Sequence, residues 1–99
     1  MRNRFLSLLG LAQRAGKLAG GEEKALQAIQ QGKAHLVILA VDASANTAKK
    51  FKDKCRYYQV PLIQEVDRGA LGKATGRMER VVIAVMDEGF ADAMLKSVE

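Results

Sequence analysis

Apolar residues recur every three or four positions in four segments of the chain, the spacing that puts them on one side of an α-helix. The segments are residues 1–15, about 22–31, about 45–57 and a last helix that begins at Asp87 or Glu88. The first ends at Gly16 and the second at Gly32, since glycine readily adopts the left-handed conformation that terminates helices. A shorter helix is expected to follow Asp67 and to stop at Gly76.

Three other apolar runs have the length of β-strands, and they cover residues 36–41, 62–66 and 81–85. The first reads Leu-Val-Ile-Leu-Ala-Val without polar alternation, which is typical of a strand covered on both faces. It is therefore the best candidate for the central strand. Because helices and strands alternate, we expect one domain over residues 1–99, a three-layer α/β/α sandwich with a small mixed sheet.

The composition fits one folded domain. Hydrophobic residues make up 48% of the chain and there is a single proline, which argues against disorder. The one cysteine, Cys55, has no partner for an intramolecular disulfide. Neither a secretory segment nor an apolar run of membrane-spanning length is apparent, so the sequence indicates a cytoplasmic protein without a membrane partner.

Charge is unevenly distributed along the chain. Sixteen basic residues oppose eleven acidic ones and leave a net charge of +5. Residues 68–80 are rich in basic side chains and carry only Glu79 as an acid, whereas the last helix is acidic. The lysines of residues 45–57 are interpreted as a solvated helix face. A small basic protein of this kind suggests a polyanionic partner, nucleic acid before a membrane surface.

Residues suited to catalysis are few. The only histidine, His35, is expected at the surface and Cys55 in the core, and the sequence places no catalytic triad or metal cluster around them. Residues 69–75 imitate a Walker A loop, but Ala74 occupies the position of the required hydroxyl. Asp42 is expected to cap a helix, because no acidic pair accompanies it as in a phospho-acceptor site. We therefore expect no enzyme activity, cofactor or metal.

Three loops are expected at the edge of the sheet where strands end and where α/β proteins bind ligands: residues 16–24, 42–44 and 76–80. Gly21 can serve as an N-cap that leaves the first backbone amides of the second helix open to a phosphate. The neighbouring acids, Glu22 and Glu23, also fit a helix that merely balances its own dipole. Lys17 and Arg77 are candidates for phosphate contacts, and Met78 for contact with a base.

Several short motifs occur in a specific order and spacing: Gly10-Leu-Ala-Gln-Arg-Ala-Gly-Lys17, Gly21-Glu-Glu, the segment from Gly32 to Ser44, Val60-Pro61, and Leu71-Gly-Lys-Ala-Thr-Gly76. Together they resemble the bacterial YlxQ-type branch of the L-seven-Ae superfamily of ribosomal proteins, over nearly the whole chain. The resemblance implies a three-layer α/β/α fold that binds kink-turn RNA, a sharply bent duplex with tandem sheared G·A pairs. It also implies association with ribosomes or structured regulatory RNAs, without catalysis.

The resemblance further implies which residues contact RNA. In the family, a Gly-x-Asn-Glu-x-x-Lys pattern at the start of the second helix reads guanine edges; here the glycine is Gly21, and the Asn, Glu and Lys positions hold Glu23, Lys24 and Gln27. Glu23 can only accept hydrogen bonds, Lys24 can only donate, and Gln27 can do both. A loop that covers a flipped-out base in the family matches residues 76–78, with a more polar composition here.

The sequence thus predicts a monomeric, non-catalytic RNA-binding protein associated with the ribosome. Its predicted RNA-binding residues are Lys17, Gly20, Gly21, Glu23, Lys24, Gln27, Asp42, Gly76, Arg77, Met78 and Arg80. The alternative is a protein-interaction or scaffold module with weak, non-specific RNA affinity, which would use the basic residues 45–57 and the acidic last helix as separate docking faces. A detached domain of an RNA-modifying enzyme is disfavoured by the lack of acid–base residues.

Overall fold

The computed structural model describes residues 2–99, so Met1 of the predicted first helix lies outside the described residues. The chain alternates helices and strands in the order α1 (Arg2–Arg14), β1 (Leu18–Gly20), α2 (Glu22–Gln30), β2 (Leu36–Leu39), α3 (Ala45–Tyr58), β3 (Leu62–Ile63), α4 (Arg68–Ala74), β4 (Val82–Val85) and α5 (Glu88–Ser97). The four helices predicted from apolar spacing and the short helix predicted after Asp67 are therefore confirmed.

The four strands form one mixed sheet in the order β1-β4-β2-β3. Strand β4 runs antiparallel to both β1 and β2, while β2 and β3 are parallel. Every residue of β2 and of β4 is buried, so these two strands share the central position that the sequence assigned to residues 36–41 alone. The predicted strand 62–66 is shorter than expected and pairs only over Leu62–Ile63.

Strand β1 was not predicted, since residues 16–24 were expected to form a loop. Its three residues pair with β4, from Leu18 opposite Val85 to Gly20 opposite Ile83. The segment is short and has no β-branched residue, so its own propensity for strand is low. The exposed hydrogen-bonding edge of β4 decides its conformation, and this partner is more than sixty residues away in sequence.

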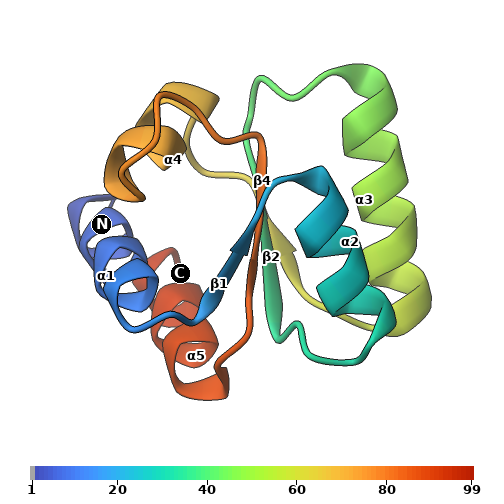
Figure 1. Ribbon diagram of the computed structural model, residues 1–99, viewed down its shortest axis with the longest axis horizontal. Coiled ribbons are helices and arrows are strands. Elements are labelled where there is room, and N and C mark those ends of the chain that lie inside the picture. The colour runs from blue at the N-terminus through green and yellow to red at the C-terminus, as the bar shows by residue number, and fades with distance from the viewer. Residues whose placement is uncertain (1) are drawn as a thin grey trace.

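Helices cover both faces of the sheet, as Figure 1 shows: α1, α4 and α5 lie on one face, and α2 and α3 on the other. Alternate strand residues point to the two sides, as expected for a pleated strand. Leu36 and Ile38 of β2 join the core with α1, α4 and α5, whereas Val37 and Leu39 join the core with α2 and α3. The α/β/α sandwich is thus confirmed.

Three helices begin at a side-chain cap. Ser44, Asp67 and Asp87 accept hydrogen bonds from backbone N–H groups of the first turns of α3, α4 and α5 at 3.2, 2.8 and 2.8 Å. Helix α2 differs, because its N-cap is Gly21, with φ of 96° and no side-chain hydrogen bond. No side chain therefore caps the first amides of α2. In the part of the chain that the structure describes, no helix is long and apolar enough to cross a membrane.

Candidate nucleic-acid interface

Parts of the three predicted loops, residues 20–24, 42–44 and 76–80, meet at the edge of the sheet where β1 and β2 end and β4 begins. The backbone N–H of Gly21 donates to the carbonyl of Val82 at 2.9 Å, and that of Ala40 donates to the carbonyl of Val81 at 2.8 Å. The N–H of Arg80 donates to the carbonyl of Arg68 at 3.0 Å. These bonds hold the start of α2, the end of β2 and the loop of residues 76–80 beside one another.

Arg80 lies against the glycines that precede α2. A β-carbon added at Gly20 would be 3.0 Å from Nε of Arg80, and one added at Gly21 would be 3.2 Å from Nη1. The missing side chains therefore make room for a guanidinium group at the amino end of α2. Since a helix amino end carries partial positive charge, placing a cation there concentrates positive potential at one spot. An anion bound there would relieve the repulsion.

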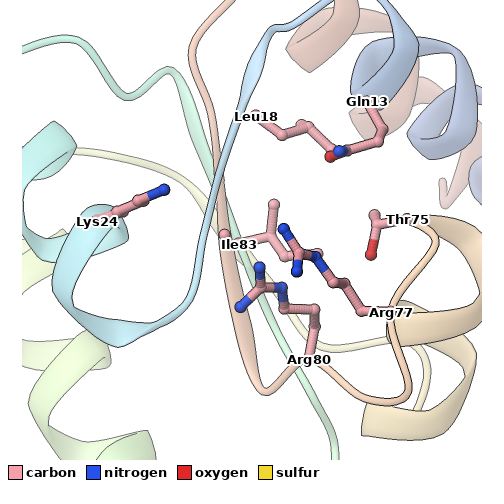
Figure 2. A pocket seen from close by; sticks show the side chains of 8 residues that line it. Gln13, Leu18, Lys24, Thr75, Arg77, Arg80 and Ile83 are labelled. Carbon is pink, nitrogen blue, oxygen red and sulfur yellow. The ribbon is translucent and has the colours of Figure 1, made fainter.

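A small cavity opens beside Arg80, with a volume of about 110 Å³. Figure 2 shows Arg77 and Arg80 from the loop on one side of β1, with Lys24 of α2 across the strand from them. None of these three cations forms an ion pair within 4.0 Å among residues 2–99. The cavity is smaller than a typical small-molecule site, so it suits a phosphate group or a protruding part of a larger anion.

The loop of residues 76–80 is seated on α4. A β-carbon at Gly72 would be only 2.4 Å from Cα of Glu79, so glycine is what permits this close approach. The N–H of Arg77 donates to the carbonyl of Gly72 at 2.8 Å, and Gly76 turns the chain with φ of 73°. As a result Met78 projects outward with 95% of its surface exposed. A large apolar side chain so exposed beside a basic cavity is suited to contact a partner.

Asp42 has a structural role at this edge. Its Oδ1 accepts from the backbone N–H of Arg68 at 2.9 Å and its Oδ2 from Nε of Arg68 at 3.3 Å, while Nη2 of Arg68 donates to the Asp42 carbonyl at 2.7 Å. Nη1 of Arg68 also lies 3.9 Å from Oε1 of Glu79. Asp42 does satisfy a helix amino end, as expected, but that of α4 and not that of the following helix. It braces the turn after β2 against α4.

The pairing with Arg68 makes the contribution of Asp42 to stability depend on pH. Partial desolvation raises the pKa of Asp42, but hydrogen bonds from the backbone N–H of Arg68 and from its own N–H, with the guanidinium charge, lower it overall. The stabilisation is thus complete above the pKa of the unfolded chain, about 4, and is lost as pH falls through the lower folded-state pKa. We expect Asp42→Asn to lower the free energy of unfolding at pH 7, and the difference to shrink below pH 4 in urea titrations. A difference that is constant with pH would contradict this role.

Of the other predicted RNA-binding residues, those of α2 and the glycines before it lie near the cavity, whereas Lys17 does not. Gly20, Gly21, Glu23 and Lys24 line a second hollow at the amino end of α2, together with Arg80. Gln27 is exposed on α2 and shares a further hollow with Lys24. Lys17 is not brought to the cavity: its carbonyl accepts from the N–H of Met86 at 2.8 Å, beyond the opposite ends of β1 and β4. Four extended residue steps separate it from Gly21, a distance of about 13 Å at 3.3 Å per residue.

Sequence reasoning missed two polar residues of the cavity, Gln13 of α1 and Thr75 at the end of α4. The hydroxyl of Thr75 donates to the carbonyl of Leu71 at 2.8 Å, so its role is to close the last turn of α4. Gln13 is exposed and reaches the site only because α1 packs against α4. No local pattern in the sequence predicts the contact between α1 and α4.

Residues that could support other chemistry are dispersed. Within residues 2–99, no group of three or more His, Cys, Asp or Glu side chains is arranged to hold a metal ion. Cys55 is buried, and burial raises the pKa of its thiol to about 11, so the thiol is unreactive at neutral pH. His35 is exposed. Both residues lie where the sequence placed them.

Comparison with known proteins gives consistent results. A model of the family described as ribosomal protein L7Ae/L30e/S12e/Gadd45 matches residues 3–95. A Bacillus subtilis protein named RNA-binding protein YlxQ is 47% identical over 91 residues, which cover 92% of this chain and 91% of that protein. The large ribosomal subunit protein eL30 of Yarrowia lipolytica is 35% identical over 92 residues, covering 87% of this chain and 81% of the relative.

Two solved structures have the same fold. A Bacillus halodurans protein of unknown function superimposes with a TM-score of 0.92 and 48% identity, over 94% of each chain. A Giardia lamblia 15.5kD RNA binding protein superimposes with a TM-score of 0.85 over 98% of this chain and 83% of the other, at 23% identity. At that identity the second likeness concerns the fold alone.

Proposed function

Because the chain belongs to the ribosomal protein L7Ae/L30e/S12e/Gadd45 family, in its YlxQ-type branch, we propose that it binds kink-turn RNA as a non-catalytic, monomeric protein. The RNA that it binds would be ribosomal RNA or a structured regulatory RNA, and the protein would act in the cytoplasm. One observation carries the proposal: Lys24, Arg77 and Arg80 line one cavity beside Gly20, next to the uncapped amino end of α2, and none of them forms an ion pair within 4.0 Å in the part of the chain described.

Each side chain has a distinct task in this proposal. Arg77 and Arg80 contact phosphates, which fixes the position and orientation of the RNA. Lys24 donates to guanine O6 or N7, Gln27 donates or accepts, and the carboxylate of Glu23 accepts from a guanine amino group. Met78 covers the face of an unstacked base with its exposed thioether chain. Asp42 acts indirectly by holding the neighbouring loops through Arg68.

The direct test compares two RNAs of equal length in an electrophoretic mobility assay. One carries a kink-turn with tandem G·A pairs, and in the other Watson–Crick pairs replace the G·A pairs. We expect the kink-turn to bind at least about tenfold more tightly, because one specific base-edge contact accounts for about 1–3 kcal/mol. Equal affinities would reject specific recognition. Recovery of the chain at high salt with a protein and no RNA would favour the scaffold alternative.

Affinity for the kink-turn should depend steeply on salt. If three or four phosphates are neutralised, the logarithm of the association constant should fall with the logarithm of salt concentration at a slope of about −2 to −4. Fluorescence anisotropy with a labelled kink-turn between 50 and 300 mM KCl, chosen as roughly the range in which counterion release is measured, gives this slope. A slope near zero would show that the three cations do not contact phosphates.

Lys24→Ala and Met78→Asp are expected to weaken kink-turn binding about tenfold each while leaving the melting temperature nearly unchanged. Both side chains are exposed, so their removal costs no core packing. Met78→Asp adds repulsion from phosphates to the loss of apolar contact. Met78→Leu is the matched control, because it keeps an apolar side chain and should retain affinity. A loss of affinity that accompanies unfolding would instead indicate a structural role.

A further inference from the structure

Two exposed tyrosines lie side by side at the carboxyl end of α3. Tyr57 is 79% exposed and Tyr58 39% exposed. Their ring centroids are 4.9 Å apart with the planes at 76°, an edge-to-face contact that holds the pair in place. Neither tyrosine belongs to the described core, and neither takes part in the proposed kink-turn site. Aromatic rings left open to solvent in this way are suited to contact a planar partner.

Lysines on the same side of α3 accompany the two rings. Lys50 and Lys54 precede Tyr57 and Tyr58 by two turns and one turn, which places all four on one helix face. With Asp53 they line an open, shallow hollow on the surface of α3. An open surface of this kind leaves the faces of the rings accessible to a flat partner such as a nucleobase. We call Lys50, Lys54, Tyr57 and Tyr58 the tyrosine–lysine surface.

Asp53, the acidic residue that lines the hollow beside this surface, is already paired with basic side chains. Oδ2 of Asp53 accepts from Nζ of Lys49 at 2.8 Å, and Oδ1 lies 3.8 Å from Nη1 of Arg56. The hydrogen bond from Lys49 lowers the pKa of Asp53, with the nearby charges of Lys49 and Arg56 adding to this, so the carboxylate stays ionised and paired. Lys50 and Lys54 form no ion pair within 4.0 Å among the residues described. Their charge is therefore available to an anionic partner.

This surface is separate from the cavity beside Arg80. The amino end of α3 follows Ser44, close to the loops at which β2 ends, whereas Tyr57 and Tyr58 lie at its other end. Helix α3 has 14 residues and spans about 20 Å. In Figure 1 its carboxyl end lies at the opposite edge of the sheet from α4 and from the start of α2. One ligand group cannot touch both places.

We propose that the tyrosine–lysine surface binds single-stranded nucleic acid, with one base stacked on Tyr57 and the adjoining phosphates contacted by Lys50 and Lys54. Stacking on an aromatic ring tolerates any base, and lysines follow the backbone, so this site is expected to show little sequence preference. An acidic peptide would use the lysines but would leave the planar ring without a planar partner. Nucleic acid uses both parts of the surface. This inference does not depend on kink-turn binding.

The composition of the chain offers a specific optical readout. It has no tryptophan and only two tyrosines, Tyr57 and Tyr58, so all tyrosine emission comes from this surface. Titration with a ten-nucleotide oligouridylate, roughly the length that covers one such site, should quench this emission in a saturable way. Lys50→Ala/Lys54→Ala keeps both fluorophores and should weaken binding about tenfold. Arg4→Ala/Lys96→Ala removes the same charge elsewhere and should shift the midpoint by less than about threefold.

Anisotropy of a labelled oligouridylate tests stacking directly. Tyr57→Ala should weaken binding roughly tenfold, since base stacking on an aromatic ring accounts for about 1–3 kcal/mol, whereas Tyr57→Phe keeps the ring and should retain affinity. Wild-type affinity of Tyr57→Ala, or saturable binding without tyrosine quenching, would overturn the inference. Equal quenching by a polyglutamate peptide would assign the surface to an acidic protein instead. A chain that binds the kink-turn but not oligouridylate would overturn this inference alone.

Discussion

Gly72→Ala is expected to lower the free energy of unfolding by about 2–3 kcal/mol and the melting temperature by roughly 10–20 °C. The added methyl group would lie 2.4 Å from Cα and 2.6 Å from the backbone nitrogen of Glu79, and 2.7 Å from the carbonyl carbon of Met78. These are backbone atoms, so rotation of a side chain cannot relieve the overlap. The loop must move away from α4. Thermal unfolding followed by circular dichroism measures the loss.

Gly69→Ala is the matched control in the same helix. Its added methyl group would meet only Oδ1 of Asp67, at 3.4 Å, which is an ordinary contact. Alanine favours helix over glycine, so this variant should be as stable as the parent chain or more stable by about 0.5–1 kcal/mol. If both variants unfold at the same temperature, the loop does not rest on Gly72 as the structure shows.

Gly72→Ala should also reduce kink-turn affinity, because the loop that rests on Gly72 carries Arg77, Met78 and Arg80. A shift of this loop would separate the guanidinium of Arg80 from Gly20 and Gly21. Kink-turn affinity should therefore fall even at temperatures where the variant remains folded, and Gly69→Ala should bind normally. This result would link the packing of α4 to the proposed binding site.

The layered fold could be predicted because local signals agree with one another. Apolar spacing predicted four of the helices, and Gly21 and Asp67 predicted where α2 and the short α4 begin. Strand β1 could not be predicted, because its conformation depends on pairing with β4 far along the chain. Three residues are too few for their own conformational preferences to predict a strand. Short edge strands are therefore the elements that sequence patterns are least able to reveal.

Part of the candidate site could also be predicted from local sequence signals, and part of it could not. Glycines and basic residues predicted that the start of α2 and the loop of residues 76–80 lie at one edge of the sheet, and the structure brings these two segments together there. The partner of Asp42 is Arg68, 26 residues later, and no local pattern joins them. Lys17 was assigned to the site because it precedes Gly20 and Gly21 in sequence, but β1 carries it to the other end of the strand. Lys17 is close to Gly21 in sequence but distant in space, because residues 18–20 between them form the extended strand β1.

Arg77→Ala/Arg80→Ala is expected to reduce affinity for kink-turn RNA by roughly a hundredfold or more. Each guanidinium that contacts a phosphate contributes about 1.5–3 kcal/mol, and two are removed. The salt slope should become shallower by about 2, one for each lost phosphate contact. Neither arginine is paired with a carboxylate within 4.0 Å in residues 2–99, so removal leaves no unpaired charge behind. The melting temperature should change little.

The control for this prediction is Arg4→Ala/Lys96→Ala, which lowers the net charge by the same amount on α1 and α5. General attraction between a basic protein and RNA would weaken equally in both double variants, whereas a site built at the amino end of α2 would lose affinity only when its own arginines are removed. Anisotropy titrations of both variants at one salt concentration make this comparison. Equal losses would reduce the proposed site to non-specific charge attraction, and unequal losses would locate the RNA beside Gly20 and Gly21.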